Sequence, residues 1–127
     1  MLIYSQKTGK LSDEKGHVIG QGWSGQLGGY NEPLLQSVAS IGPLPVGMYT
    51  IGEVYTHEHL GPIVMNLEPD KYNTMYGRSL FRIHGASSQH PELSSHGCII
   101  MPRVVRVLIS KMNEKRLQVV SGIDILV

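Results

Sequence analysis

Turn-forming residues punctuate this chain at short intervals, which limits each uninterrupted element to a few residues. The 15 glycines and 7 prolines include pairs such as Gly28-Gly29, Gly42-Pro43 and Gly61-Pro62, and pairs of this kind mark turns and loops. The runs between them are rich in aliphatic and β-branched residues, which favour strands. We expect strands over 2–5, 17–21, 48–55, 63–67, 80–84, 117–120 and 123–127. This spacing predicts a mainly β barrel or sandwich rather than alternating strand–helix units.

One segment departs from this pattern and is typical of a helix. Pro102 is favourable at a helix start, and the residues after it have helical spacing. The apolar stripe consists of Val104, Val105, Leu108, Ile109 and Met112. The charged side consists of Arg103, Arg106, Lys111 and Glu114. We expect one helix over 102–114, packed on the sheet, and a short helical turn over 32–38.

Length and charge narrow the class of protein. A chain of 127 residues is enough for one compact core, so we expect a single domain over 1–127. The formal net charge is +1 and no basic run is present, which argues against a nucleic-acid partner. No apolar run approaches the about 20 residues of a spanning helix, and no signal-peptide pattern is visible. We therefore expect synthesis in the cytoplasm and no membrane insertion.

The single cysteine is the residue most indicative of chemistry. Cys98 stands alone, which excludes an intrachain disulfide and Cys-rich metal sites. The stretch 83–101 that contains it also holds His84, His90 and His96. A thiol becomes a strong nucleophile when an imidazole or a positive charge promotes its ionisation. We expect Cys98 to be a nucleophile rather than an inert buried thiol, with His84 as its base.

The residues just before the cysteine suggest how an intermediate is stabilised. Gly97 permits a tight or left-handed turn ahead of Cys98. The backbone N–H groups of His96, Gly97 and Cys98 can then converge as an oxyanion hole for acyl transfer. A helix that begins near Pro102 would lower the thiol pKa further if its N-terminus points at the sulfur. His96 competes with His84 as the base, although its place in the turn favours contact with substrate.

Several residues are candidates for substrate binding. Arg78 and Arg82 share parity along the strand that leads to His84, so either guanidinium could hold a carboxylate. The alternative for both is an exposed arginine on a strand. Arg103, one turn beyond the thiol, is a comparable candidate. Trp23 lies in a glycine-rich stretch, where it could line a groove or pack in the core.

Two other classes of function remain open. His84, His96 and Cys98 are enough ligands for a catalytic zinc site, which makes a zinc-dependent peptidase the alternative enzyme. His57 and His59 share a face of an extended chain, but two ligands make a weak metal site. The other alternative is a non-catalytic module that binds the cell wall or a partner protein. For the thiol enzyme we expect no metal and no cofactor.

The sequence around these residues resembles a known enzyme family. Ser95-His96-Gly97-Cys98-Ile99, preceded by His84-Gly85, looks like the signature of the YkuD-type L,D-transpeptidases. Over nearly the whole chain it is more similar to the small L,D-transpeptidase-like toxins of type VI secretion systems and to related phage and prophage proteins. The segments that carry this similarity are 4–9, 22–25, 42–47, 61–62, 76–79 and 98–103.

The resemblance implies a mostly β domain that modifies the stem peptides of peptidoglycan. It implies Cys98 as nucleophile, His84 as general base and the Gly85 carbonyl as the group that orients the imidazole. The His96, Gly97 and Cys98 amides would form the oxyanion hole. Ser95 belongs to the same signature and is a candidate to contact substrate; the alternative is that its hydroxyl satisfies backbone groups of the loop.

The resemblance also implies a reaction and a place of action. Cys98 would attack the carbonyl on the L-centre of the third stem residue and release D-alanine. Water as acceptor gives an L,D-carboxypeptidase, and an amine gives transpeptidation or exchange of a D-amino acid. The segment from His84 to Ser95 is short, and Ile100 stands where cross-linking enzymes often carry Arg or Asn, which favours the toxin-like subgroup. Such a protein acts in the periplasm after delivery by a type VI system or a phage, and an immunity protein is a candidate partner.

Overall fold

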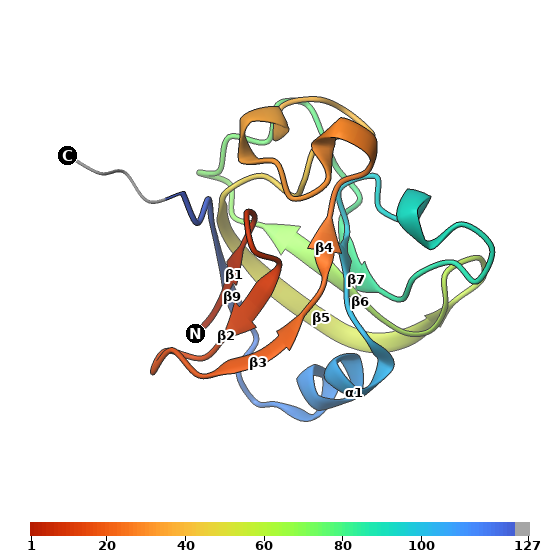
Figure 1. The fold of residues 1–127 in the computed structure, drawn as a ribbon. Helices are drawn as coiled ribbons and strands as arrows, with labels where there is room; N and C mark the ends of the chain where they lie inside the picture. Colours follow the sequence, from red (N-terminus) through yellow and green to blue (C-terminus); the bar gives the residue numbers. More distant parts are fainter. Residues whose placement is uncertain (124–127) are drawn as a thin grey trace.

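The computed structural model describes residues 1–123, and it contains one nine-stranded sheet of order β3-β2-β1-β9-β5-β6-β7-β8-β4 (Figure 1). The strands are β1 (Leu2–Ser5), β2 (Lys10–Ser12), β3 (Val18–Gln21), β4 (Trp23–Ser24), β5 (Gly47–His57), β6 (Gly61–Pro69), β7 (Arg82–His84), β8 (Ile99–Ile100) and β9 (Arg116–Val120). The prediction of a mainly β fold is confirmed. Of the strand predicted over 123–127, Ile123 is outside any strand, and 124–127 lie outside the described residues.

The two edge strands of this sheet are consecutive in the chain, because only Gly22 separates β3 from β4. The Gly22 N–H donates to the Gly9 carbonyl at 2.9 Å. A Cβ atom added at Gly22 would lie 1.7 Å from the Ile100 carbonyl oxygen, so this close approach requires glycine. The sheet therefore curls around its core and brings its edges together at Gly22.

The apolar core lies on the inner face of the curled sheet. Its members are Leu2, Tyr4, Leu11, Leu44, Tyr49, Ile51, Met65, Leu67, Phe81, Ile83, Ile99, Met101, Val105, Ile109, Leu117 and Val119. Ile83 and Ile99 pair across β7 and β8 and both belong to this core. Because successive side chains of a strand alternate between faces, His84 and Ile100 lie on the outer face.

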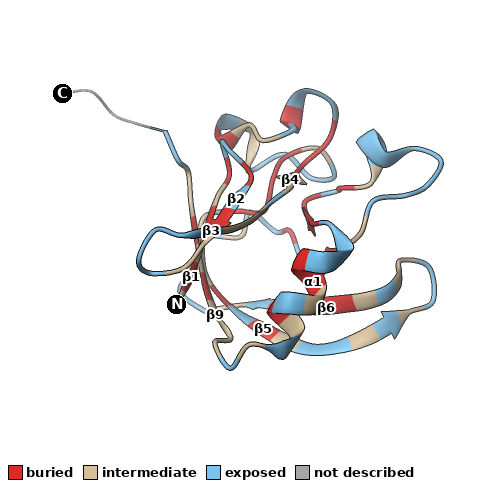
Figure 2. Ribbon diagram, turned by 60° about the horizontal axis from the view of Figure 1, so that its bottom comes forward, coloured by how far each residue is buried: buried red, intermediate tan, exposed pale blue. Residues whose placement is uncertain are grey.

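The one α-helix within residues 1–123, α1 (Arg103–Lys111), is shorter than the predicted 102–114. Pro102 is its N-cap residue, and the chain turns extended at Met112. The buried residues of α1 are Val105, Arg106 and Ile109, and Figure 2 shows its buried and exposed sides. Val104 is 76% exposed and Leu108 47% exposed, so only part of the predicted apolar stripe packs on the sheet.

Arg106 belongs to the charged side of the predicted helix, opposite the apolar stripe, yet the structure buries it. Its guanidinium donates to the carbonyls of Met101 at 3.0 Å, Pro62 at 2.9 Å and Ile63 at 3.1 Å. These hydrogen bonds satisfy the buried group and fasten α1 to the start of β6.

Three short 3₁₀ helices lie in the loops: η1 (Leu27–Gly29), η2 (Pro33–Leu35) and η3 (Pro91–Leu93). Within the predicted helical turn over 32–38, only η2 is helical. Among residues 1–123, none of the helices has the length and apolar character needed to span a membrane.

Candidate active site

The parallel pairing of β7 with β8 brings the predicted catalytic residues together. Ile83 pairs with Ile99 and His84 with Ile100, which places Cys98 beside Arg82. The Arg82 backbone N–H donates to the Cys98 sulfur at 3.3 Å. Cys98 and His84 therefore lie on the same face of adjacent strands, displaced by two residues along the strand direction.

The His84 side chain is a buried imidazole whose orientation is fixed by one hydrogen bond. It is 3% exposed, and its Nδ1 lies 2.8 Å from the Gly85 carbonyl oxygen. A carbonyl can only accept, so the proton belongs on Nδ1, and Nε2 is left as the basic nitrogen. Burial lowers the pKa of His84, and the charges of Arg106 and Arg82 lower it further. The imidazole is therefore neutral near pH 7.

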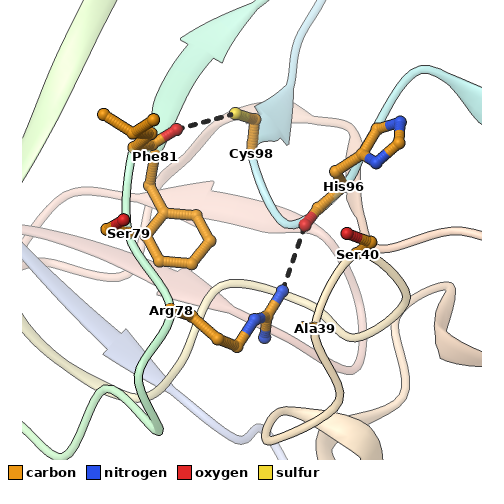
Figure 3. A pocket seen from close by; sticks show the side chains of 8 residues that line it. Ala39, Ser40, Arg78, Ser79, Phe81, His96 and Cys98 are labelled. Atoms are coloured by element: carbon orange, nitrogen blue, oxygen red, sulfur yellow. Dashed lines mark hydrogen bonds between the residues drawn. The ribbon is translucent and has the colours of Figure 1, made fainter.

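The Cys98 thiol is shielded rather than pre-ionised. It donates to the Leu80 carbonyl at 3.9 Å (Figure 3), and burial raises its pKa despite the Arg82 N–H and the charges of Arg82 and Arg78. The expectation of a lowered thiol pKa was therefore wrong, because burial outweighs the positive groups. The N-terminus of α1 lies beyond β8 and lines a different pocket. Among residues 1–123, no hydrogen bond joins the sulfur to His84.

The thiol opens into a pocket of about 320 Å³. Its lining residues are Ala39, Ser40, Arg78, Ser79, Leu80, Phe81, His96 and Cys98. His96 is exposed, and its ring points away from the thiol in Figure 3. His84 does not line this pocket; the strand pairing places it on the same face of the sheet as Cys98, two residues further along.

Ser95 and Gly97 shape the turn that presents the thiol. Ser95 is fully buried; its Oγ accepts from the N–H of Gly25 at 2.8 Å and of Gly97 at 3.2 Å, and it donates to the Cys98 carbonyl. Ser95 is thus placed inside the protein rather than at an open substrate surface. The Gly97 amide donates to Ser95 Oγ, so the prediction that it forms part of the oxyanion hole is wrong for this structure. Among residues 1–123, the His96 and Cys98 amides donate to no carbonyl in the turns and loops.

Gly97 itself can only be glycine. Its φ of +128° lies in a region that L side chains avoid. An added Cβ would lie 2.5 Å from Arg78 Nη2 and 2.5 Å from the Phe81 ring. Ser24 Oγ donates to the Gly97 carbonyl at 2.9 Å, which fixes the turn from the β4 side.

Arg78 is a buried residue whose guanidinium fixes this turn by hydrogen bonds. Its terminal nitrogens donate to the carbonyls of Gln36, Pro43, Gly42 and His96. Its guanidinium carbon also lies 5.2 Å from the centre of the Phe81 ring. The terminal nitrogens are thus occupied by backbone carbonyls, and no acid pairs with Arg78 among residues 1–123.

The other predicted substrate residues line two further pockets. Arg82 lines a pocket of about 250 Å³ on the other side of Leu80, and its Nε donates to the Tyr55 hydroxyl at 3.1 Å. Trp23 and Arg103 line a pocket of about 220 Å³ that excludes Cys98. The structure therefore spreads these candidates over a surface wider than the thiol pocket.

Two residues near the site were not foreseen. A Cβ added at Gly85 would lie 2.6 Å from Arg106 Nη2, so Arg106 packs on the residue that orients His84. Leu80 has a φ of +66° and is 77% exposed beside the thiol. Neither has a signal in the sequence, since both depend on contacts between distant segments.

The described residues do not form the alternative zinc site. Among residues 1–123, no three His, Cys, Asp or Glu side chains are grouped to hold a metal ion. His84 turns Nδ1 to Gly85, and the His96 ring points away from Cys98, so these three residues do not converge. His57 Nδ1 accepts the backbone N–H groups of His59 and Leu60, which explains that histidine pair as part of a turn.

Comparison with known proteins gives one finding. The model of the Tlde1 domain matches residues 19–123, a range that contains the Cys98 turn and the three pockets next to it. Searches among curated proteins and among solved structures found no match.

Proposed function

This chain belongs to the Tlde1 domain family, a family of type VI secretion effectors of the L,D-transpeptidase type, and from that premise we propose a specific chemistry. Cys98 is the nucleophile of an acyl transfer on peptidoglycan stem peptides, and His84 is its general base. The observation that carries this proposal is a buried, oriented imidazole that shares a face of adjacent parallel strands with the thiol, two residues along the strand direction. The family also indicates secretion and action in the periplasm.

The first half of the reaction forms a thioester. His84 Nε2 takes the thiol proton while the sulfur attacks the carbonyl carbon of the third stem residue at its L-centre. The tetrahedral intermediate then breaks its C–N bond, and His84 returns the proton to the leaving amine of D-alanine. The acyl group remains on Cys98.

The second half transfers the acyl group to an acceptor. Water or the amine of a D-amino acid attacks the thioester while His84 removes the acceptor's proton. The C–S bond breaks, and the thiolate recovers its proton from the imidazolium. Water gives hydrolysis, and an amine gives exchange or a new cross-link.

The electrostatics support proton transfer during attack rather than a preformed ion pair. Burial raises the pKa of Cys98 and lowers that of His84, so the resting pair is a neutral thiol and a neutral imidazole. The charges of Arg82 and Arg78 favour the thiolate as it forms. The free amides of His96 and Cys98 are candidates to bind the oxyanion.

The decisive test is mass spectrometry of stem tetrapeptides after incubation with the protein. We expect loss of the terminal D-alanine in buffer, or its replacement when another D-amino acid is added. Cys98→Ala should abolish both, whereas a chelator should change neither. Unchanged peptides with the wild-type protein would contradict the proposal, and a reaction that a chelator abolishes would favour the zinc-dependent peptidase.

The same variant separates the enzyme from a binding module. A module that only binds the cell wall or a partner should keep its effect on bacteria after Cys98→Ala. An enzyme should lose that effect while it keeps its fold, which circular dichroism can verify.

A further inference from the structure

A second pocket shares a wall with the thiol pocket. Ser79, Leu80 and Phe81 line both, so Leu80 stands between them. The second pocket has a volume of about 250 Å³ and is completed by residues of β6 and by Arg82. Arg82 links the two, because its backbone N–H donates to the Cys98 sulfur while the residue lines the second pocket.

The second pocket carries one acid and one base that do not neutralise each other. Asn66 pairs with Arg82 across β6 and β7, and Glu68 lies two residues further along β6 on the same face. Both Glu68 and Arg82 line the pocket. Within the described range 1–123, neither forms an ion pair. Arg82 instead donates to the Tyr55 hydroxyl and to the Leu80 carbonyl.

We propose, on the basis of the proposed function, that this pocket binds a zwitterionic α-amino acid group. Arg82 receives its carboxylate, which a guanidinium binds well, and Glu68 receives its ammonium. A ligand with a single charge would pair with one of these two residues and leave the other without a partner. A group that carries both charges on one carbon matches the pocket, and the exposed side chain of Leu80 lines it for the methylenes that follow.

Two molecules in the reaction carry such a group. One is the acyl donor, when its third residue is a diamino acid whose side chain ends in an ammonium and a carboxylate. The other is a free amino acid of the acceptor class, which this pocket would hold before the amine loses its proton and moves to the thioester. In either case the bound amino acid group would be separated from the thiol pocket by Leu80.

The donor side chain is tested by binding to full-length Cys98→Ala protein, which needs no turnover. Three tetrapeptides differ only at the third residue: meso-diaminopimelate, with ammonium and carboxylate; L-lysine, with ammonium alone; and L-norleucine, with neither. Calorimetry should rank their affinities in that order, with steps of about 10-fold, the scale of one charge-assisted hydrogen bond. Arg82→Gln should close the step between diaminopimelate and lysine. Glu68→Gln should close the step between lysine and norleucine.

The free amino acid is tested in the same protein with D-methionine and with the corresponding amine that lacks the carboxylate. If D-methionine is the ligand, it should bind more tightly than the amine, and Arg82→Gln should remove that difference. Glu58→Gln, on the exposed turn between β5 and β6, is the matched control and should alter none of these ratios.

The outcomes are separable. Ratios that change among the peptides assign the pocket to the donor side chain, and ratios that change with D-methionine assign it to the acceptor. Ratios that no variant changes in either arm would overturn the zwitterion pocket. The proposed acyl transfer is judged apart from this, by D-alanine release from the wild-type protein.

Discussion

Arg78 donates to the carbonyl oxygen of His96 at 3.1 Å, which fastens the turn that presents Cys98 to the segment that precedes β7. The same guanidinium binds the carbonyls of Gln36, Gly42 and Pro43. One buried side chain thus fixes the turn and places a positive charge near the thiol.

Arg78→Met and Arg78→Lys should separate these two effects. Both leave buried carbonyls without donors, at a cost of about 1–3 kcal/mol each, so both should lower the urea midpoint. Only Arg78→Met removes the charge, so only it should raise the thiol pKa, measured as iodoacetamide alkylation against pH. Lys111→Met, on the exposed side of α1, is the control. Equal alkylation profiles for both Arg78 variants and wild type would contradict the electrostatic role.

His84→Ala and His96→Ala should differ strongly in turnover. A general base contributes about 10²–10⁴-fold, and we expect D-alanine release to fall on that scale for His84→Ala. His96→Ala should lose less, because the His96 ring points away from the thiol. His84→Ala should also slow alkylation at neutral pH. If His96→Ala slows alkylation and His84→Ala does not, the assignment of the base is wrong.

The pH dependence of kcat/KM should show its acidic limb below pH 6.5. Burial lowers the pKa of His84 from its ordinary value of 6.5, so the imidazole stays neutral and basic until the pH falls through that lowered value. Protonation below it removes the base, and the rate declines. A limb above pH 6.5 would mean that His84 is more exposed in solution or that another group controls the rate. The pH profile of Cys98 alkylation in His84→Gln distinguishes these explanations: a limb that disappears belongs to His84, and a limb that remains belongs to another group.

Leu80→Gly should reduce activity at little cost to stability. The left-handed backbone at Leu80 costs about 1–2 kcal/mol for a residue with a Cβ, and its relief offsets the about 0.5–1 kcal/mol of extra chain entropy that glycine brings. The loss of the side chain opens the wall between the two pockets, so KM should rise. Leu27→Gly changes another exposed leucine with positive φ and should leave kcat/KM unchanged. A lower melting temperature for Leu80→Gly with normal KM would refute this role.

The protein should be toxic to Gram-negative cells only when it reaches the periplasm. Expression in the cytosol of Gram-negative cells should be harmless, because the stem peptides of the wall lie in the periplasm. The same chain with an added export signal should round or lyse the cells, and the exported Cys98→Ala variant should not. Equal growth in all cases, with the exported protein shown to be folded, would count against action on the wall.

The sequence predicted the long strands and the helix because their patterns are local. β2, β4 and β8 have only two or three residues each, and they exist through hydrogen bonds to distant strands, so no local pattern indicates them. The motif predicted that Cys98 lies near His84. The structure achieves this through the parallel pairing of β7 with β8, and the two-residue strand β8 was not predicted. Arg106 and Arg78 look like ordinary surface arginines in the sequence, and only tertiary contacts bury them.

The meeting of the two sheet edges at Gly22 makes the geometry of the site depend on strands from both ends of the chain. β4 holds β8 beside β7, while β1 pairs in parallel with β9, so the Cys98 turn is supported by segments from both ends. In an unfolded chain, the thiol and the imidazole are two side chains fourteen positions apart in the sequence, with nothing to hold them together. The thiol and the imidazole come together only when the sheet has closed, so a change that frees either edge of the sheet would remove the site while leaving Cys98 and His84 in place.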